Sequence, residues 1–351
     1  MIYQIIHHFF INFIFIFNPF DMLKNSIVLP IAYVTRKVAQ MAETPIVYST
    51  EGAAGKPVVV VHGGAGRRRH PFTPEREQQA AADIKRALDA AMAVLDAGGS
   101  ALDAVVAGVH VMEDAPEFNA GRGAALTSEG RAEMDSCVMT GDGRCGAVAG
   151  ADCVRNPIDA ARAVMEKTPH VLMVEPTEAQ CEAWGVETAP QSYFILPERV
   201  RQLAELQALP DGGWDKPGHG TIGVVARDAA GNIAAGTSTG GVTNQQPGRV
   251  GDSPIAGAGT YANQQTLAVS CTGTGERFIQ ESAGYQLHAR VLWAGQTPSD
   301  AAKAVLEAVE DRGGDGGLIC IPVEGEAVVA HNACAQMDWG YAFGDVRVTH
   351  N

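Results

Sequence analysis

Hydrophobic residues along this chain fall into two patterns, short continuous runs and longer segments with a helical repeat. Residues 57–62, Pro-Val-Val-Val-Val-His, predict a buried strand that ends in a glycine turn. Thr73, followed by Pro74, is the expected N-cap of a helix that extends to Gly98-Gly99. Ser100 is the expected cap of a second helix, whose small side chains allow close packing on a sheet.

The middle of the chain repeats these patterns and then loses them. Two strand-like runs at residues 134–139 and 147–150 flank a glycine turn, and Asn156-Pro157 introduces another helix. From residue 190 to 220 the periodicity fades. The stretch 209–220, which is rich in glycine and proline, is expected to be an exposed loop. Loops of this kind tolerate scission of the chain.

After residue 220 the chain returns to short strands and amphipathic helices. The expected elements are a hairpin at 221–237, a strand at 267–271, helices at 276–294 and 299–310, and strands at 318–322 and 327–330. Each half of the chain thus places strands beside paired helices. Two sheets that helices cover on one face only must bury their bare faces against each other. We therefore expect an α/β (α+β) chain folded as a four-layer αββα sandwich.

Composition and charge narrow the classes of partner. The formal net charge is −14, with 40 acidic against 26 basic side chains, so we expect no nucleic-acid partner. The basic cluster Arg67-Arg68-Arg69 is interpreted as a solvated loop. Seven cysteines, an odd number without CxxC spacing, argue against a disulfide framework or a structural zinc site and favour reduced thiols in the cytoplasm.

Residues 1–41 differ in composition from the rest of the chain. The segment 5–20 is dense in isoleucine and phenylalanine, but Asn12, Asn18 and Pro19 interrupt it, and the first basic residue is Lys24. It is short for a membrane span and lacks the basic start of a signal peptide. Three interpretations stay open: a false upstream start with the chain beginning near Met41, an unusual export signal, or a membrane tether. We expect this extension to be disordered or irrelevant to the fold.

The dipeptide Gly220-Thr221 stands where the polar loop gives way to a β-branched run. A threonine hydroxyl is a weak nucleophile without a nearby base, and a free α-amine on the same residue can supply that base. An α-amine titrates near neutral pH, so it can accept a proton under working conditions. A cut between Gly220 and Thr221 would therefore create nucleophile and base together, although alone the threonine could simply begin a strand.

Four segments rich in glycine and threonine give this dipeptide its significance. They are residues 219–223, 237–241, 247–254 and 271–276. Residues 236–240 match the GxSxG pattern of serine hydrolases, but Pro247-Gly248 follows too soon for the helix that this motif requires. A non-catalytic protein that grips aspartate-like ligands remains an alternative.

Taken together, these segments resemble the plant-type (type 2) asparaginase and isoaspartyl peptidase family of N-terminal nucleophile (Ntn) hydrolases, over about residues 57–345. Further matching motifs are His62-Gly63-Gly64-Ala65-Gly66, Phe118-Asn119-Ala120-Gly121-Arg122-Gly123-Ala124, Glu133-Met134-Asp135, residues 146–149 and residues 314–318. The resemblance implies an αββα Ntn fold and a threonine amidohydrolase that activates itself by autoproteolysis. Its expected substrates are L-asparagine and N-terminal β-aspartyl dipeptides.

The resemblance also implies the catalytic residues. Thr221 becomes the nucleophile when the Gly220–Thr221 bond is cut, and Thr239 supports its hydroxyl. Thr272 and the backbone N–H of Gly273 form the oxyanion hole.

A second set of residues is expected to bind the substrate. Arg249 holds the α-carboxylate, because a guanidinium matches a carboxylate with two parallel hydrogen bonds. Asp252 holds the α-ammonium, with the carbonyl of Gly275 beside it. Asn119 lies near the active site in relatives.

No cofactor is required, but the family has a loop in which main-chain carbonyls bind a structural sodium ion. The residues that match this loop are Met112, Glu113, Ala115, Phe118, Ala120 and Arg122.

Processed relatives pair as (αβ)₂, so we expect an α subunit of residues 42–220, a β subunit of residues 221–351 and a homodimer of the pair. Glycine before the threonine favours the asparaginase branch over the glycosylasparaginases, which remain an alternative. His331-Asn332-Ala333-Cys334 departs from the family pattern, which puts the far end of the pocket in doubt. His219 could tune self-cleavage or simply lie in the surface loop.

Overall fold

The computed structural model describes residues 44–66, 73–209 and 220–350. The expectations placed on residues 1–41, on Arg67-Arg68-Arg69 and on His219 lie outside the described residues. The chain separates into two units, Met1–Thr44 and Pro45–Asn351, and the helices and strands given below belong to the second. None of the described helices has the length and apolar character that crossing a membrane requires.

In the described part of the second unit, eight strands form the larger sheet. Their order is β13 (Val346–His350), β12 (Gln336–Phe343), β2 (Val58–Gly66), β6 (Ile222–Arg227), β7 (Ile233–Thr239), β3 (Met134–Thr140), β4 (Cys145–Ala151) and β5 (Leu172–Val174). The pairs are antiparallel except for β4 and β5 at one edge. The predicted hairpin after residue 220 therefore forms the centre of this sheet.

A smaller sheet faces the larger one. Among the described residues its five strands have the order β1 (Ile46–Ser49), β11 (Val328–His331), β10 (Gly316–Pro322), β9 (Leu267–Gly273) and β8 (Thr260–Ala262). All of its pairs are antiparallel. Since β9 comes from the same half of the chain as β6 and β7, this half contributes to both sheets.

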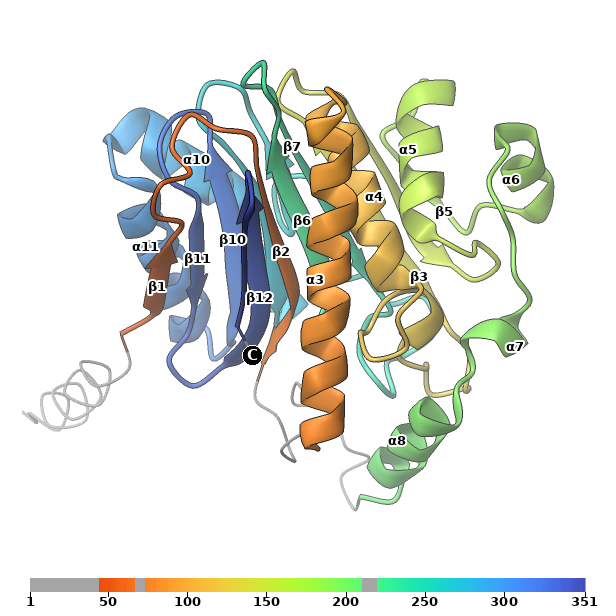
Figure 1. The fold of residues 1–351 in the computed structure, drawn as a ribbon. Coiled ribbons are helices and arrows are strands. Elements are labelled where there is room, and N and C mark those ends of the chain that lie inside the picture. Colours follow the sequence, from red (N-terminus) through yellow and green to blue (C-terminus); the bar gives the residue numbers. More distant parts are fainter. Residues whose placement is uncertain (1–43, 67–72, 210–219, 351) are drawn as a thin grey trace, which may run out of the picture. The chain divides into compact units, whose positions relative to one another are not determined.

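Helices cover the outer face of each sheet. On the larger sheet lie α3 (Pro74–Asp96), α4 (Ala101–Glu113) and α5 (Pro157–Lys167), and on the smaller sheet α9 (Gly275–Glu281), α10 (Ala283–Ala294) and α11 (Pro298–Asp311). Figure 1 shows the four layers in sequence from α11 to α3. As expected, the side chains of Thr73 and Ser100 cap the first two helices. The predicted αββα sandwich is thus confirmed.

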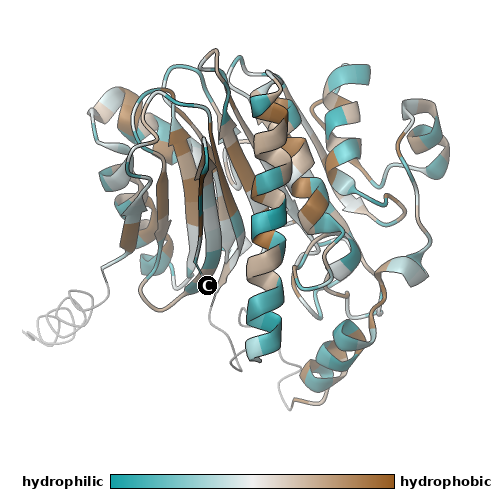
Figure 2. Ribbon diagram, viewed as in Figure 1, coloured by the Kyte–Doolittle hydropathy of each residue, from teal (hydrophilic) through white to brown (hydrophobic). Residues whose placement is uncertain are grey.

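The inner faces of the two sheets change from hydrophobic to polar along the strands. At one end Val58, Val60 and Val225 of the larger sheet pack against Ile319 and Ile321 of the smaller one. Figure 2 shows the hydrophobic colouring of the strands inside the sandwich. Because side chains alternate between faces along a strand, the same face carries polar residues further on. These are His62, Thr221, Thr237, Thr239, Ser270 and Thr272, all of them buried.

Two predictions about the elements were wrong, and the helices between residues 190 and 209 were missed. The first wrong prediction is the glycine turn at residues 63–66, which the structure places within β2, paired with β12. Between residues 190 and 220 the chain forms α7 (Gln191–Phe194) and α8 (Pro197–Gln207), in addition to the earlier α6 (Glu178–Trp184). The repeat of α8 is weak because only a narrow stripe, which includes Leu203 and Leu206, is buried. The predicted loop at 209–220 lies almost wholly outside the described residues.

The second wrong prediction is a single helix over residues 276–294. Ser282 has a left-handed backbone, with φ of 49°, and separates α9 from α10. The N–H groups of Gly284 and Tyr285 donate to the carbonyls of Ala258 and Gly257 in a neighbouring loop, rather than to their own helix. This tertiary anchoring ends α9 and starts α10 at a new angle, and no local sequence signal announces it.

Candidate active site

Thr221 directly precedes the central strand β6 at the polar end of the interface between the sheets. Its side chain is buried, and Oγ1 donates a hydrogen bond of 3.2 Å to Oγ1 of Thr239. The register that pairs Ile222 with Ser238 brings these two threonines side by side. Thr239 Oγ1 also accepts from the N–H of Gly241 at 3.1 Å. The Thr239 oxygen is therefore held as an acceptor for the Thr221 hydroxyl.

Gly220 packs backbone to backbone against the glycine-rich end of β2, residues 63–66. A Cβ atom on Gly220 would lie 2.0 Å from Cα of Gly64 and 2.8 Å from the nitrogen of Ala65. A Cβ atom on Gly64 would lie 2.2 Å from Cα of Gly220, and Gly64 has φ of +110°. No real Cβ fits at such distances, so both positions require glycine. This contact fixes the backbone of Gly220 just before the predicted nucleophile.

The same end of β2 reaches the predicted oxyanion hole. The N–H of Ala65 donates to Oγ1 of Thr272 at 3.1 Å, and Thr272 is fully buried on β9. Gly273 follows with φ of +141°, where a Cβ would lie 2.2 Å from the carbonyl oxygen of Asp315. Since this end of β2 touches both Gly220 and Thr272, it brings the predicted cleavage site and the predicted oxyanion residues together.

Arg249, Asp252 and Gly275 also converge. A Cβ atom on Gly275 would lie 2.8 Å from Oδ1 of Asp252 and 3.0 Å from Nη2 of Arg249. Nε of Arg249 donates to Oε1 of Glu276 at 3.1 Å, which leaves the two Nη groups for a ligand. The side chain of Arg249 is 16% exposed. The site therefore holds one cation and one anion close together, as a zwitterionic amino acid requires.

Asp252 has the electrostatics of a ligand-binding carboxylate. It is 4% exposed, and its Oδ2 has no hydrogen-bond partner among the described residues. Burial raises the pKa of Asp252 to about 7, against the opposing effect of the Arg249 guanidinium. A buried carboxylate oxygen without a donor is costly. An ammonium group on a ligand would supply the missing donor and lower this pKa.

Two further acidic residues, to which the sequence analysis assigned no role, hold the loop that carries Arg249. Oε2 of Glu133 accepts from the N–H of Gly248 at 2.7 Å. Oδ2 of Asp135 accepts from the N–H of Gly251 at 3.0 Å. The loop is thus pinned on both sides of Arg249. The motif Glu133-Met134-Asp135 was the available signal, since two acids at the start of a buried strand need donors.

Asn119 supports the turn that follows Thr239. Its Nδ2 donates to the carbonyl of Gly241 at 2.6 Å, and its Oδ1 accepts from the N–H of Ala125 at 2.7 Å. Its own carbonyl accepts from the N–H of Gly240 at 2.9 Å. Through Gly241 this residue orients the donor that binds Thr239. Direct contact between Asn119 and a substrate stays a prediction.

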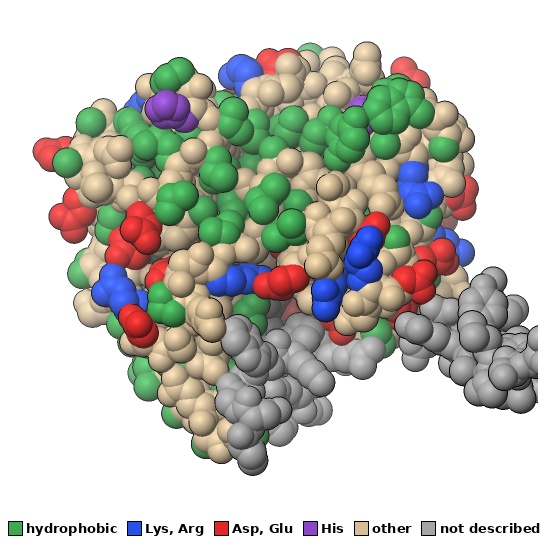
Figure 3. Space-filling view, turned by 180° about the vertical axis from the view of Figure 1, so that it is seen from behind, with side chains coloured by type: hydrophobic (Ala, Val, Ile, Leu, Met, Phe, Trp, Pro, Cys, Tyr) green, Lys and Arg blue, Asp and Glu red, His purple; other side chains and the backbone are tan. Residues whose placement is uncertain are grey.

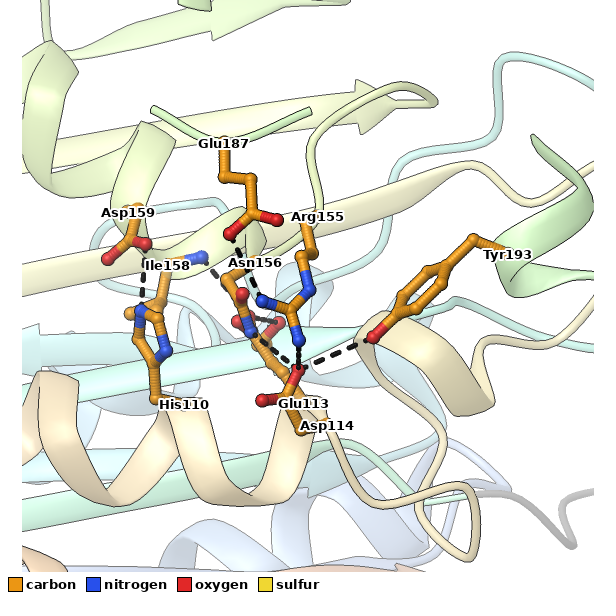
Figure 4. A network of polar contacts seen from close by, with 10 residues as sticks. His110, Glu113, Asp114, Arg155, Asn156, Ile158, Asp159, Glu187 and Tyr193 are labelled. Atoms are coloured by element: carbon orange, nitrogen blue, oxygen red, sulfur yellow. Dashed lines mark hydrogen bonds and ion pairs between the residues drawn. The ribbon is translucent and has the colours of Figure 1, made fainter. Parts of the chain in front are cut away.

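Glu113, from the predicted sodium loop, is attached to the back of β7. Its Oε1 accepts from Oγ of Ser238 at 2.6 Å and from the N–H of Ile158 at 3.1 Å. Burial raises the pKa of Glu113 to about 8. Figure 4 shows this carboxylate within a polar cluster in which His110 faces Asp159. The strand that carries Thr239 is therefore held from both faces.

The remaining residues of this loop bury their backbone. Met112, Ala115, Phe118 and Ala120 are buried, whereas Arg122 is exposed. The carbonyl of Phe118 accepts from Nη2 of Arg199 at 3.1 Å. No group of three or more His, Cys, Asp or Glu side chains within the described ranges could hold a metal ion. The described residues thus provide no side-chain cluster for a metal ion, and sodium binding by main-chain carbonyls stays a prediction.

Comparison with known proteins gives consistent matches. The family described as asparaginase matches residues 55–349. The isoaspartyl peptidase of Salmonella typhimurium is 43% identical over 307 residues, which cover 84% of this chain and 98% of that protein. The isoaspartyl peptidase of Escherichia coli is 42% identical, with coverage of 84% and 96%. The human isoaspartyl peptidase/L-asparaginase is 39% identical, with coverage of 82% and 93%.

The first prediction concerns the backbone contact at Gly220. Gly220→Ala should slow self-cleavage by about tenfold or more, equivalent to about 1.4 kcal/mol in the barrier, because the new methyl group displaces the bond from Thr221. A time course on a denaturing gel measures this rate. Gly231→Ala, in the β6–β7 turn, is the control: with φ of +81° it strains the backbone, but its methyl group meets no atom within 4 Å, so it tests for strain without a contact at the cut. Equal cleavage rates for Gly220→Ala and the unmodified protein would contradict the prediction.

The second prediction concerns Asp252. Only its ionised form can bind a substrate ammonium, so kcat/KM should fall as pH decreases through about 7. In the complex the ammonium keeps Asp252 ionised, so the acid limb of kcat should lack this ionisation. A free Thr221 amine would affect both parameters alike. Steady-state kinetics from pH 5 to 9 on an amino-acid amide separates the two groups. Identical acid limbs for kcat and kcat/KM would exclude Asp252.

Proposed function

Since this chain belongs to the asparaginase family, we propose that it hydrolyses L-asparagine to aspartate and ammonia and cleaves N-terminal β-aspartyl dipeptides. One observation carries the proposal. The hydroxyl of Thr221 lies against Thr239, while Oδ1 of the buried Asp252 carboxylate and Nη2 of Arg249 both lie beside Gly275. The first pair suits acyl transfer, and the second suits the charged end of an α-amino acid.

Activation begins in the continuous chain. Thr221 Oγ attacks the carbonyl carbon of Gly220, the C–N bond breaks and a C–O ester bond forms, and the hydroxyl proton passes to the released amine. Water then hydrolyses the ester. The α subunit ends at Gly220 and the β subunit begins at Thr221. The contacts that support this step are the hydrogen bond to Thr239 and the packing of Gly220 on Gly64.

Catalysis uses the new α-amine as the base. The amine takes the proton of Thr221 Oγ, which attacks the side-chain carbonyl carbon of the substrate. The hydroxyl of Thr272 and the N–H of Gly273 stabilise the oxyanion, and each such donor contributes about 3 kcal/mol. The leaving amine departs with the proton and leaves an aspartyl ester. Water, deprotonated by the same α-amine, releases aspartate and restores Thr221.

Substrate choice depends on the leaving group. Arg249 offers its Nη groups to the α-carboxylate and Asp252 accepts from the α-ammonium, and asparagine and β-aspartyl dipeptides share both groups. They differ only in the amine that departs. Asn332 belongs to the segment 331–334, which departs from the family pattern. Its Oδ1 accepts from the N–H of Gly316 at 3.0 Å, so this segment also holds β10. A glycosylasparaginase-like amidase remains the alternative within the enzyme class.

Three further features belong to this proposal. Main-chain carbonyls of the loop at residues 112–122 hold a sodium ion, since neutral oxygens are the ligand type that hard cations prefer. Two processed copies pair as (αβ)₂, supported by hydrophobic side chains gathered on one face (Figure 3). The protein works in the cytoplasm, where its seven cysteines stay reduced. Atomic emission analysis and sedimentation of the processed protein test the ion and the assembly.

The third prediction tests the nucleophile. Thr221→Ala should yield an uncut, inactive chain, because both the attacking hydroxyl and the base are lost. Thr221→Ser is the matched control and should still cleave, since it keeps a hydroxyl beside Thr239. Intact-mass analysis and release of ammonia from asparagine measure the two outcomes. A normal pair of fragments from Thr221→Ala would reject the cleavage site, and activity without cleavage would reject the mechanism.

The fourth prediction tests substrate binding. Arg249→Lys keeps the charge but loses the planar pair of donors, so KM should rise by about 10- to 100-fold, or about 1.4 to 2.8 kcal/mol. The effect on kcat should be smaller, since the reacting carbonyl lies elsewhere. Arg144→Lys, at an exposed arginine that pairs with Asp142, is the control. Unchanged KM in Arg249→Lys would remove this residue from the site.

A further inference from the structure

Two cysteines on neighbouring strands of the larger sheet lie in contact. Sγ of Cys137 on β3 lies 3.6 Å from Sγ of Cys145 on β4, close enough for one thiol to donate to the other. The register pairs Cys137 with Ala147 and Cys145 with Met139, so the two cysteines are diagonal neighbours. Side chains two residues apart on a strand share a face, so both sulfurs lie on the same side of the sheet. Neither cysteine has a role in the chemistry proposed above.

The two thiols differ in their exposure to solvent. Cys137 is fully buried, whereas Cys145 is partly exposed and follows the exposed Arg144 of the hairpin turn. A small molecule in solution therefore reaches Cys145 first, with the sulfur of Cys137 directly behind it. An accessible thiol beside a second, resolving thiol is the arrangement that two-step exchange with a disulfide requires.

The contact between the sulfurs makes Cys145 the better nucleophile. The hydrogen bond with Cys137 lowers the pKa of Cys145, against the opposing effect of burial, because a thiolate at Cys145 accepts from the neighbouring thiol. The same contact, together with burial, raises the pKa of Cys137. The thiolate is the form that attacks a disulfide, so the reaction begins at Cys145.

We propose that Cys137 and Cys145 form a reversible modification site that reacts with low-molecular-weight disulfides such as oxidised glutathione. Sγ of Cys145 attacks one sulfur of the reagent, whose S–S bond breaks as the new S–S bond forms, and one thiol is released. Sγ of Cys137 then attacks Sγ of Cys145 and displaces the second thiol. The two cysteines lose two electrons to the reagent, and their two protons end on the released thiols. The resting state is the dithiol, in keeping with the free cysteines of the structure.

Closing this bond requires a local movement of the backbone. Diagonal neighbours in a sheet lie about 7–8 Å apart at Cα, slightly further than the separation of about 4.4–6.8 Å in most disulfides. Cys137 is held on its other side by Thr237 of β7. Strand β5 pairs only with residues 147–149 of β4, so within the described ranges no second strand holds Cys145. The start of β4 is therefore the part that moves toward β3.

The fifth prediction is a disulfide between Cys137 and Cys145 in folded protein treated with oxidised glutathione. Trypsin cuts after Arg144, so the two cysteines fall in separate peptides, residues 132–144 and 145–155, unless the bond joins them. Mass spectrometry after alkylation of the remaining thiols should find the joined peptides in most molecules, and none after reduction. Separate peptides with both cysteines alkylated would overturn the proposal.

Single substitutions test the order of the two steps. Cys137→Ser removes the resolving thiol, so glutathione should stay attached to Cys145. Cys145→Ser removes the attacking thiol, so Cys137 should stay reduced. Cys153 lies in the same tryptic peptide as Cys145, so Cys153→Ser must keep the joined peptides. Loss of the joined peptides in Cys153→Ser, or glutathione on Cys137 in Cys145→Ser, would reject the assignment. Melting temperatures show whether each variant is folded, and the test on the unmodified protein stands without them.

A second cysteine pair supplies the matched control. Cys271 on β9 and Cys320 on β10 are also diagonal neighbours, because their register partners are Leu318 and Val269, but both are fully buried. Solvent reaches neither thiol, so both should stay reduced and be alkylated only after denaturation. Equal oxidation of this pair would mean that exposure of Cys145 selects nothing, and would overturn the site. Catalytic activity is not the readout, so this inference and the proposed function fail separately.

Discussion

The spacing between the two facing sheets determines how the residues of the proposed site meet. Thr221 and Thr239 lie on the larger sheet, and Thr272 lies on the smaller one, so no single element brings the reacting groups together. Valines and isoleucines fill the interface at one end and fix the separation at which the faces meet. At the other end the same alternation of side chains presents hydroxyls. The hydrophobic core and the site are therefore two ends of one interface.

Glycines let the backbones approach within this interface. Gly64 and Gly220 touch so closely that neither could carry a side chain, and the N–H of Ala65 then reaches Thr272. The glycine-rich end of β2 thus links Gly220, which precedes the proposed nucleophile, to Thr272 of the proposed oxyanion hole. The cost is conformational entropy, since glycine loses more freedom than other residues on folding. The packed helices and strands around this end of β2 offset that cost.

The four layers could be predicted from the sequence because the helices and strands in each layer leave local sequence patterns. Capping by Thr73 and Ser100 and the valine run at 57–62 identify elements that the structure contains. The break at Ser282 was missed because it depends on carbonyls from a distant loop. The site residues followed from a family resemblance rather than from spacing, since they lie on separate strands. The contact between Arg249 and Glu276 joins residues 27 positions apart, and no periodicity reveals it.

Oδ2 of Asp252, which has no hydrogen-bond partner among the described residues, has a consequence for catalytic turnover. An empty site keeps a buried anion short of one donor, and any bound amino acid with a free ammonium relieves that deficit. Aspartate carries the same ammonium and carboxylate as asparagine, so the roles proposed for Arg249 and Asp252 would bind reactant and end product through identical groups. Such recognition gives no means to expel aspartate. Feedback by accumulated aspartate thus follows from the binding roles proposed for Arg249 and Asp252.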